Sequence, residues 1–146
     1  MLDGMRCERH NQVVDFIAGK LRENPRWDVL VEPKDARGFK PDIVVRMKDK
    51  SKAWIIDPTI RMETTIEDIA RKNTEKETKY AATAEEIRRE GFSCVVVKGL
   101  WIGARGIISS DCKTFLKSIG FEKQDFQKMI CLVLRLSHSM YSMFLH

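Results

Sequence analysis

"KPDIVVRMKDKSKAWIIDPTIR", residues 40–61, contains the clearest structural signal in the chain. Two apolar runs rich in β-branched residues, 42–47 and 53–60, are joined by the polar segment "KDKSK", a pattern that predicts a β-hairpin. Asp42 opens the first run, and Asp57 lies inside the second. A carboxylate inside an apolar strand costs free energy unless it is paired or coordinated, so Asp57 indicates a functional site. Asp42 fits the same site, but it also fits ordinary turn chemistry after a proline.

The remaining elements follow from the spacing of apolar residues. The sequence predicts, in order, a helix over 11–24 with Asn11 as N-cap, a strand over 27–32, the hairpin, a helix over 64–90 capped by Thr64 or Thr65, a strand over 92–98, a glycine-rich loop over 99–108, and helices over 109–119 and 123–146. This order predicts an α/β fold with three layers, α/β/α. Its centre is a mixed four-stranded sheet, an antiparallel meander joined by a parallel strand after a crossover helix.

A chain of 146 residues is long enough for one hydrophobic core. We expect residues 1–10 to be the remnant of an upstream segment, residues 11–121 to form the main domain, and residues 122–146 to form a C-terminal helix that packs on it. The first ten residues are too polar for a signal peptide. Arg135 interrupts the apolar tail, so no membrane role is expected.

Cysteine usage indicates a reducing, intracellular compartment. Cys7, Cys94, Cys112 and Cys131 lie far apart and form no C-x-x-C pair. The last three are in apolar or helical segments, and we predict that they are buried thiols.

The net charge of +5 favours a polyanionic partner such as nucleic acid. Basic residues flank both aspartates in the sequence: Lys34, Arg37, Lys40 and Arg46 near Asp42, and Arg61, Arg71 and Lys72 near Asp57. If these side chains gather on one face, they would bind phosphates. If they are spread around the surface, they contribute only solubility.

The two aspartates suggest a divalent-metal phosphodiesterase. Mg²⁺ prefers hard oxygen ligands, and carboxylates on paired neighbouring strands can converge on one ion if both point to the same face. Such enzymes also need a cation near the metal, but Asp57 is followed by no lysine on its own strand. The candidates lie on the next helix, where Lys76, Lys79 and Tyr80 are helical neighbours. Glu8 or Asp15 on the first helix could supply a further carboxylate.

The motifs "KPDIVV", "IIDPTIR" and "KETKY", in this order and spacing, resemble a variant of the PD-(D/E)xK nucleases. The similar proteins are the restriction-like endonuclease domains at the C-terminus of site-specific non-LTR retrotransposon polyproteins that insert into ribosomal RNA genes. In that family the strand lysine is displaced into the helix as K-x-x-K-Y, which Lys76, Lys79 and Tyr80 match. The resemblance runs from about Arg9 to Gly120.

The resemblance implies a restriction-endonuclease-like fold and a nuclear protein that nicks target DNA with Mg²⁺ or Mn²⁺, exposing a 3′-hydroxyl for reverse transcription. Asp42 and Asp57 would be metal ligands, and Lys76 or Lys79, with Tyr80, would complete the catalytic group. The implied partners are DNA and, through the parent polyprotein with its RNA-directed DNA polymerase, element RNA. No small-molecule cofactor or membrane is implied.

The sequence departs from the family in three respects. The polymerase motif Tyr-x-Asp-Asp is missing, which suggests a C-terminal fragment or truncated copy. Only Cys7 and His10 could remain from the family's zinc knuckle, and two ligands cannot close a structural zinc site. His10 is instead interpreted as a polar residue at the helix entry that contacts backbone. Pro58, directly after Asp57, is unusual for a central strand. Two alternatives stay open: a structure-specific nuclease such as a junction resolvase, and a degenerate, non-catalytic DNA-binding module.

Overall fold

The predicted hairpin lies at the centre of the sheet in the computed structural model, which describes residues 2–143. The last residues of the predicted final helix, 144–146, and residue 1 are outside the described residues. In chain order the elements are α1 (Leu2–Leu21), β1 (Trp27–Val31), β2 (Ile43–Met47), β3 (Ala53–Arg61), α2 (Ile66–Lys79), α3 (Ala81–Arg89), β4 (Val95–Gly103), α4 (Ser110–Ser118) and α5 (Lys123–Ser142).

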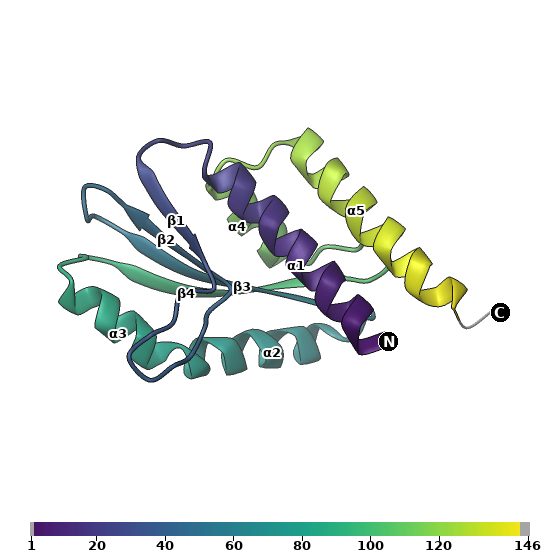
Figure 1. Ribbon diagram of the computed structural model, residues 1–146, viewed down its shortest axis with the longest axis horizontal. Coiled ribbons are helices and arrows are strands. Elements are labelled where there is room, and N and C mark those ends of the chain that lie inside the picture. Colours follow the sequence, from purple (N-terminus) through teal and green to yellow (C-terminus); the bar gives the residue numbers. More distant parts are fainter. Residues whose placement is uncertain (1, 144–146) are drawn as a thin grey trace.

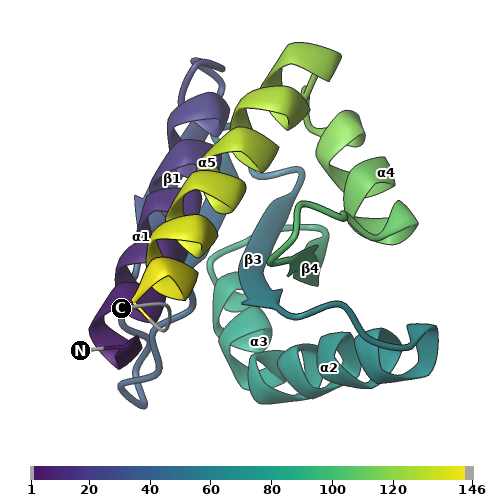
Figure 2. The ribbon, with the colours of Figure 1, turned by 90° about the vertical axis from the view of Figure 1, so that its right-hand side faces the viewer.

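The sheet has the order β1-β2-β3-β4, with β1, β2 and β3 antiparallel and β4 parallel to β3. Helices α1, α4 and α5 cover one face, and α2 and α3 cover the other (Figures 1 and 2). A buried apolar cluster fills each interface: residues such as Ile17, Ile56 and Met129 pack on the α1 side, and Ile55, Ala84 and Ile87 on the α3 side. The predicted three-layer α/β/α fold with a mixed four-stranded sheet is confirmed.

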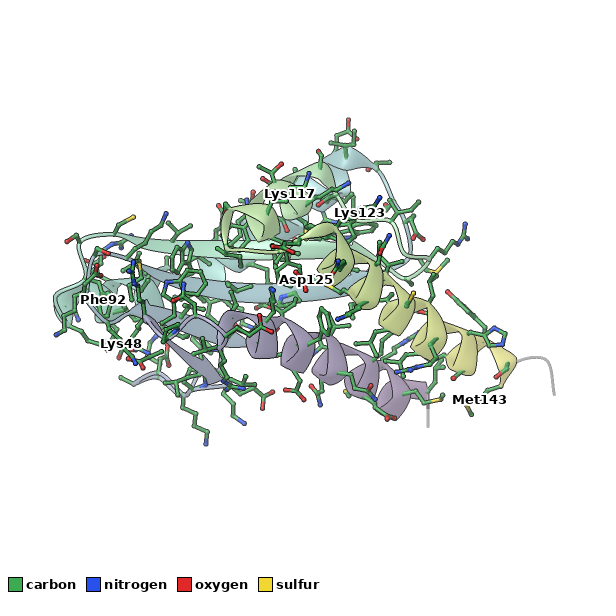
Figure 3. The ribbon with its side chains drawn as sticks, turned by 90° about the horizontal axis from the view of Figure 1, so that it is seen from above. Lys48, Phe92, Lys117, Lys123, Asp125 and Met143 are labelled. Carbon is green, nitrogen blue, oxygen red and sulfur yellow. The ribbon has the colours of Figure 1, made fainter. Side chains whose placement is uncertain are left out.

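Helix α1 begins at Leu2, so the predicted N-cap Asn11 lies in the middle of the helix. Its first half is held against α5, where the buried Arg9 donates a hydrogen bond of 3.0 Å to the Ser137 hydroxyl. Near the end of α1, Lys20 pairs with Asp125 at 3.3 Å, and Figure 3 labels Asp125 at the start of α5. These tertiary contacts explain why the helix is longer than its local capping signals indicate.

The helix predicted over 64–90 is two helices that meet at Tyr80. Thr65 is its N-cap, as predicted, and accepts a hydrogen bond of 3.1 Å from the backbone N–H of Asp68. Strand β4 continues into the segment predicted as a glycine-rich loop, because it pairs with β3 as far as Gly103. Gly99 permits a close approach of α2 to β4, since a Cβ there would lie 2.7 Å from Oδ1 of Asn73.

The cysteine prediction is correct only for Cys112, which is buried. Cys94 and Cys131 are exposed, as is Cys7. Cys94 lies just before β4, and Cys131 is on the outer surface of α5, so neither enters a core cluster. None of the helices within residues 2–143 combines the length and apolar character that a bilayer crossing requires.

Candidate metal centre

The hairpin register brings the two predicted aspartates together. Ile43 pairs with Ile56, so continuing the antiparallel register by one residue sets Asp42 opposite Asp57. Successive side chains alternate between the two faces of a strand, so both carboxylates lie on the face that carries Val44 and Ile55. Asp57 is only 2% exposed, whereas Asp42 is half-buried. The site is therefore a pair of neighbouring carboxylates at the point where β2 begins.

His10 completes this group from the opposite layer of the fold. Its Nε2 atom lies 3.0 Å from Oδ2 of Asp42 and 3.2 Å from the carbonyl oxygen of Pro58. One ligand atom from each of His10, Asp42 and Asp57 lies within 4.8 Å of the other two. Ligands on opposite sides of a Mg²⁺ ion lie about 4.2 Å apart, so small side-chain rotations would close the three around one ion. The group can hold a metal ion.

Pro58 fits its place in β3 because β2 does not extend that far: its first residue, Ile43, lies opposite Ile56. Pairing with β2 stops at Ile56, whereas pairing with β4 continues to Arg61. The N–H and C=O groups of one strand residue point to the same side, and the carbonyl of Pro58 faces His10. The missing N–H is therefore on the open side of β3, and no ladder hydrogen bond is lost. The carbonyl oxygen is also an oxygen ligand of the kind that hard cations accept.

Lys76 is the helical lysine that reaches the carboxylates. Its Nζ lies 3.2 Å from Oδ1 of Asp57, and the close contact of α2 with β4 at Gly99 keeps this part of the helix near the sheet. Lys79 lies elsewhere, with its Nζ 5.1 Å from the centre of the Tyr80 ring. The two predicted lysine candidates therefore differ in geometry, and of the two only Lys76 contacts the metal group.

Tyr80 is buried, and its hydroxyl donates a hydrogen bond of 3.3 Å to the carbonyl of Lys40. This bond anchors the segment that leads into Asp42. Burial raises the pKa of Tyr80, and the nearby carboxylate of Asp57 raises it further, so the hydroxyl remains a proton donor. The contact of Tyr80 is thus with the backbone two residues before Asp42.

The two carboxyl groups have pKa values displaced in opposite directions. Burial, together with the adjacent Asp42, raises the pKa of Asp57 to about 6, although Lys76 acts against this shift. Burial also acts to raise the pKa of Asp42, but its hydrogen bonds with His10 and Asp57 and the nearby positive charges hold that pKa below its usual value. Two carboxylates at this separation cannot both ionise easily. A proton therefore remains on Asp57 until near-neutral pH.

The hydrogen bond with Asp42 raises the pKa of His10 above its usual value, against the effect of burial. Both neighbours of Nε2 are hydrogen-bond acceptors, so Nε2 carries a proton in this arrangement. Nδ1 lies 3.4 Å from Oδ1 of Asn11, which can accept a hydrogen bond from a protonated Nδ1. A metal ion would have to replace the proton on Nε2, and Asn11 would then hold the other ring nitrogen in the required tautomer.

The other predicted carboxylates are not part of the metal group. Glu8 is exposed and accepts a hydrogen bond of 3.1 Å from Gln12. Asp15 is exposed and lines a small pocket of about 200 Å³ together with His10 and Asp42. Cys7 is exposed on α1 and is absent from the metal group found within residues 2–143. Within these residues, the structure therefore does not support a zinc site formed by Cys7 and His10.

The seven predicted phosphate-binding residues differ in whether they form ion pairs. Four of them lie in ion pairs: Arg37 with Asp35, Arg46 with Glu90, Arg71 with Asp68 and Glu75, and Lys72 near Glu75. Lys34 and Lys40 are exposed on the loop before Asp42, and Arg61 is exposed at the end of β3. Only these three are without an ion-pair partner within residues 2–143. Phosphate binding by the seven residues stays a prediction.

Sequence reasoning missed His10 as a partner of the aspartates. Its predicted backbone contact exists, at the Pro58 carbonyl, but His10 also contacts a carboxylate 32 residues away in the chain. No local pattern encodes such a contact; only the proximity of α1 to the hairpin reveals it.

No protein-family model matches the chain, and a search of curated proteins finds no match. The function is therefore inferred from the chemistry of this site and from the motif resemblance.

Proposed function

We propose that the chain is a divalent-metal-dependent DNA endonuclease domain that nicks target DNA and so provides the 3′-hydroxyl that primes reverse transcription. Its substrate and setting would be those of the retrotransposon nucleases that its motifs resemble. The observation that carries the proposal is the meeting of Asp42, Asp57 and Lys76, drawn from two strands and a helix. A lysine that contacts one of two adjacent carboxylates suits metal-assisted phosphodiester hydrolysis, because it adds a positive charge where the phosphate would bind.

Each residue would have a defined part in the reaction. A bound Mg²⁺ or Mn²⁺ would polarise the scissile phosphate and lower the pKa of a water ligand. Asp57 would bind the ion after losing its proton, and Asp42, which ionises more readily, would bind it across the strand pair. The Lys76 ammonium, 3.2 Å from Asp57, would stabilise negative charge that builds on the phosphate and orient the attacking water.

The ligand set bears on which metal is used. Two carboxylates and the Pro58 carbonyl offer hard oxygens that suit Mg²⁺. Coordination by the His10 imidazole would favour Mn²⁺, because nitrogen ligands suit transition metals better than they suit Mg²⁺. If His10 instead only hydrogen-bonds to Asp42, as in the structure, it positions that carboxylate and the site remains an oxygen site.

The proposal is tested by nicking of supercoiled plasmid in Mg²⁺, with Lys79→Ala as the matched control for Lys76→Ala. Both lysines lie on α2, but only Lys76 contacts Asp57. We expect Lys76→Ala to lower the nicking rate by at least about 100-fold, the magnitude typical of a lost electrostatic catalyst. Lys79→Ala should stay within about twofold of wild type, as exposed charges contribute little. Equal rates for the two variants would contradict the proposed role.

The same assay separates the two alternatives. A structure-specific nuclease would cut a four-way junction much faster than linear duplex. A degenerate binding module would bind DNA but give no metal-dependent nicking on either substrate.

A further inference from the structure

A second pocket, of about 750 Å³, is lined by both charged and apolar side chains. It is bounded by the first half of α1, the end of β3, the start of α2 and the end of α5. Three arginines line it: Arg6 and Arg9 from α1, and Arg61 from β3. We call it the arginine pocket. The metal group uses none of its residues.

Arg9 is the unusual member of the arginine pocket. It is 7% exposed, and within residues 2–143 its only side-chain hydrogen bond goes from Nη1 to the Ser137 hydroxyl, while its buried Nε has no partner. Burial lowers the pKa of Arg9, but guanidinium remains charged in proteins. A buried cation without a carboxylate is costly, and an anion in the pocket would offset that cost.

Within residues 2–143, the acidic residues of the pocket form no ion pair with its arginines. Glu63 accepts a hydrogen bond of 2.9 Å at Oε1 from the backbone N–H of Arg105, while its buried Oε2 has no hydrogen-bond partner and lies 3.7 Å from Nε of Arg105. Asp68 is paired with Arg71. Arg61 is exposed and has no ion-pair partner within residues 2–143. The first turn of α2 also lines the pocket, and a helix N-terminus favours anions.

Planar guanidinium groups bind phosphate through parallel hydrogen bonds, so the chemistry of the pocket matches a phosphate group. Its position relative to the metal centre indicates which phosphate. Arg9 is the neighbour of His10 on α1, and Arg61 lies four residues beyond Asp57 on β3, or about 13 Å along the strand. Consecutive phosphates of one DNA strand rise about 3.4 Å along the axis while the strand also winds around it, so this straight-line distance spans fewer than four nucleotides. Tyr141, 43% exposed, adds an aromatic ring at the pocket.

We propose that the arginine pocket binds a backbone phosphate of the nucleic-acid strand that is cut, a few nucleotides from the scissile bond. The identity of this ligand rests on the proposed nuclease function, whereas phosphate binding by the pocket does not. The pocket would set the register of the strand at the metal centre and would supply affinity without reading base sequence.

The first experiment observes the pocket directly. The Nε–H resonance of Arg9, assigned from its loss in Arg9→Lys, is followed by NMR while inorganic phosphate is added to the intact chain. We expect this resonance to shift in a saturable way. The Nε–H of Arg89, an exposed arginine on α3, should not shift.

The second experiment measures binding of duplex DNA with Ca²⁺ in place of Mg²⁺, at several salt concentrations. Arg61→Gln tests the pocket without altering a buried group, and Arg89→Gln is its matched control. We expect Arg61→Gln to weaken binding about five- to tenfold and to lower the salt slope by about one, the effect of one lost phosphate contact. Arg89→Gln should bind as the wild type does.

The outcomes separate this inference from the proposed function. If wild type nicks DNA but Arg61→Gln keeps its affinity and salt slope, the pocket inference is wrong and the nuclease stands. If phosphate shifts the Arg9 resonance but DNA is neither bound nor cut, the pocket binds a free anion and the assignment to a DNA strand fails. The inference is overturned entirely if phosphate does not shift the Arg9 resonance and Arg61→Gln binds DNA as the wild type does.

Discussion

Replacing Asp57 by asparagine should make the metal-free protein more stable at pH 8. The asparagine side chain has nearly the same shape as aspartate, can accept from Lys76 through its oxygen, and can donate to Asp42 through its amide. It differs mainly in having no charge. The wild-type carboxyl is 2% exposed and shares its site with a second carboxylate. Ionising Asp57 in the folded state is therefore unfavourable, and the variant avoids that cost.

The size of the effect follows from the pKa difference. The pKa of Asp57 is about 6 in the folded protein, against an ordinary value of 3.8, and each pKa unit corresponds to about 1.36 kcal/mol. The folded state holds its proton more tightly than the unfolded chain does. The protonated Asp57 carboxyl therefore adds to the free energy of unfolding. This stabilisation is fully present below about pH 4 and is lost as the pH rises through 6. At pH 8 the loss amounts to about 3 kcal/mol, which the variant should not suffer.

The assay is urea unfolding in EDTA at several pH values between about 3.5 and 8, read as the free energy of unfolding. Asp57→Asn should match wild type near the acid end of this range and exceed it increasingly towards the alkaline end. Asp42→Asn is the control with the opposite sign, because the pKa of Asp42 is lowered by folding; it should be less stable than wild type at pH 8. If Asp57→Asn shows no gain at pH 8, the account of this carboxyl pair is refuted.

Three further predictions concern the same site. At subsaturating Mg²⁺ the nicking rate should rise with pH through about 6, because the proton on Asp57 competes with the ion; a rate that is flat between pH 5 and 8 under these conditions would contradict this. Gly99→Val should push α2 away from β4, because a Cβ at Gly99 would lie 2.7 Å from Oδ1 of Asn73. The nicking rate should then fall more than about tenfold. The control Gly19→Val, on the open surface of α1, should leave the nicking rate nearly unchanged. Tyr80→Phe removes the hydrogen bond to the Lys40 carbonyl; urea unfolding should show a loss of about 1 kcal/mol, with equal stability counting against the anchoring role.

The sheet could be predicted from the sequence because its signals are local. The two β-branched runs and the polar turn between them specify the hairpin, and the hairpin register sets Asp42 opposite Asp57. The contact of a helical lysine with Asp57 could also be predicted as a choice between two residues on one helix, but only the packing of α2 on β4 separates Lys76 from Lys79.

The features that could not be predicted depend on contacts between residues far apart in the chain. His10 contacts Asp42, 32 residues away in the chain, and Arg46 pairs with Glu90, 44 residues away. The early start of α1 depends likewise on the contact of Arg9 with Ser137. Helix caps, periodicity and charge runs carry no information about such pairs.

The central claim, that Asp42 and Asp57 together hold a divalent metal ion, is tested most directly by titrating the protein with Mn²⁺ and measuring the free ion by electron paramagnetic resonance near neutral pH. We expect one bound ion per chain for wild type and for Lys79→Ala. This binding should be lost in both Asp42→Asn and Asp57→Asn, while urea unfolding shows that the variants remain folded. Undiminished Mn²⁺ binding by Asp57→Asn would contradict the claim.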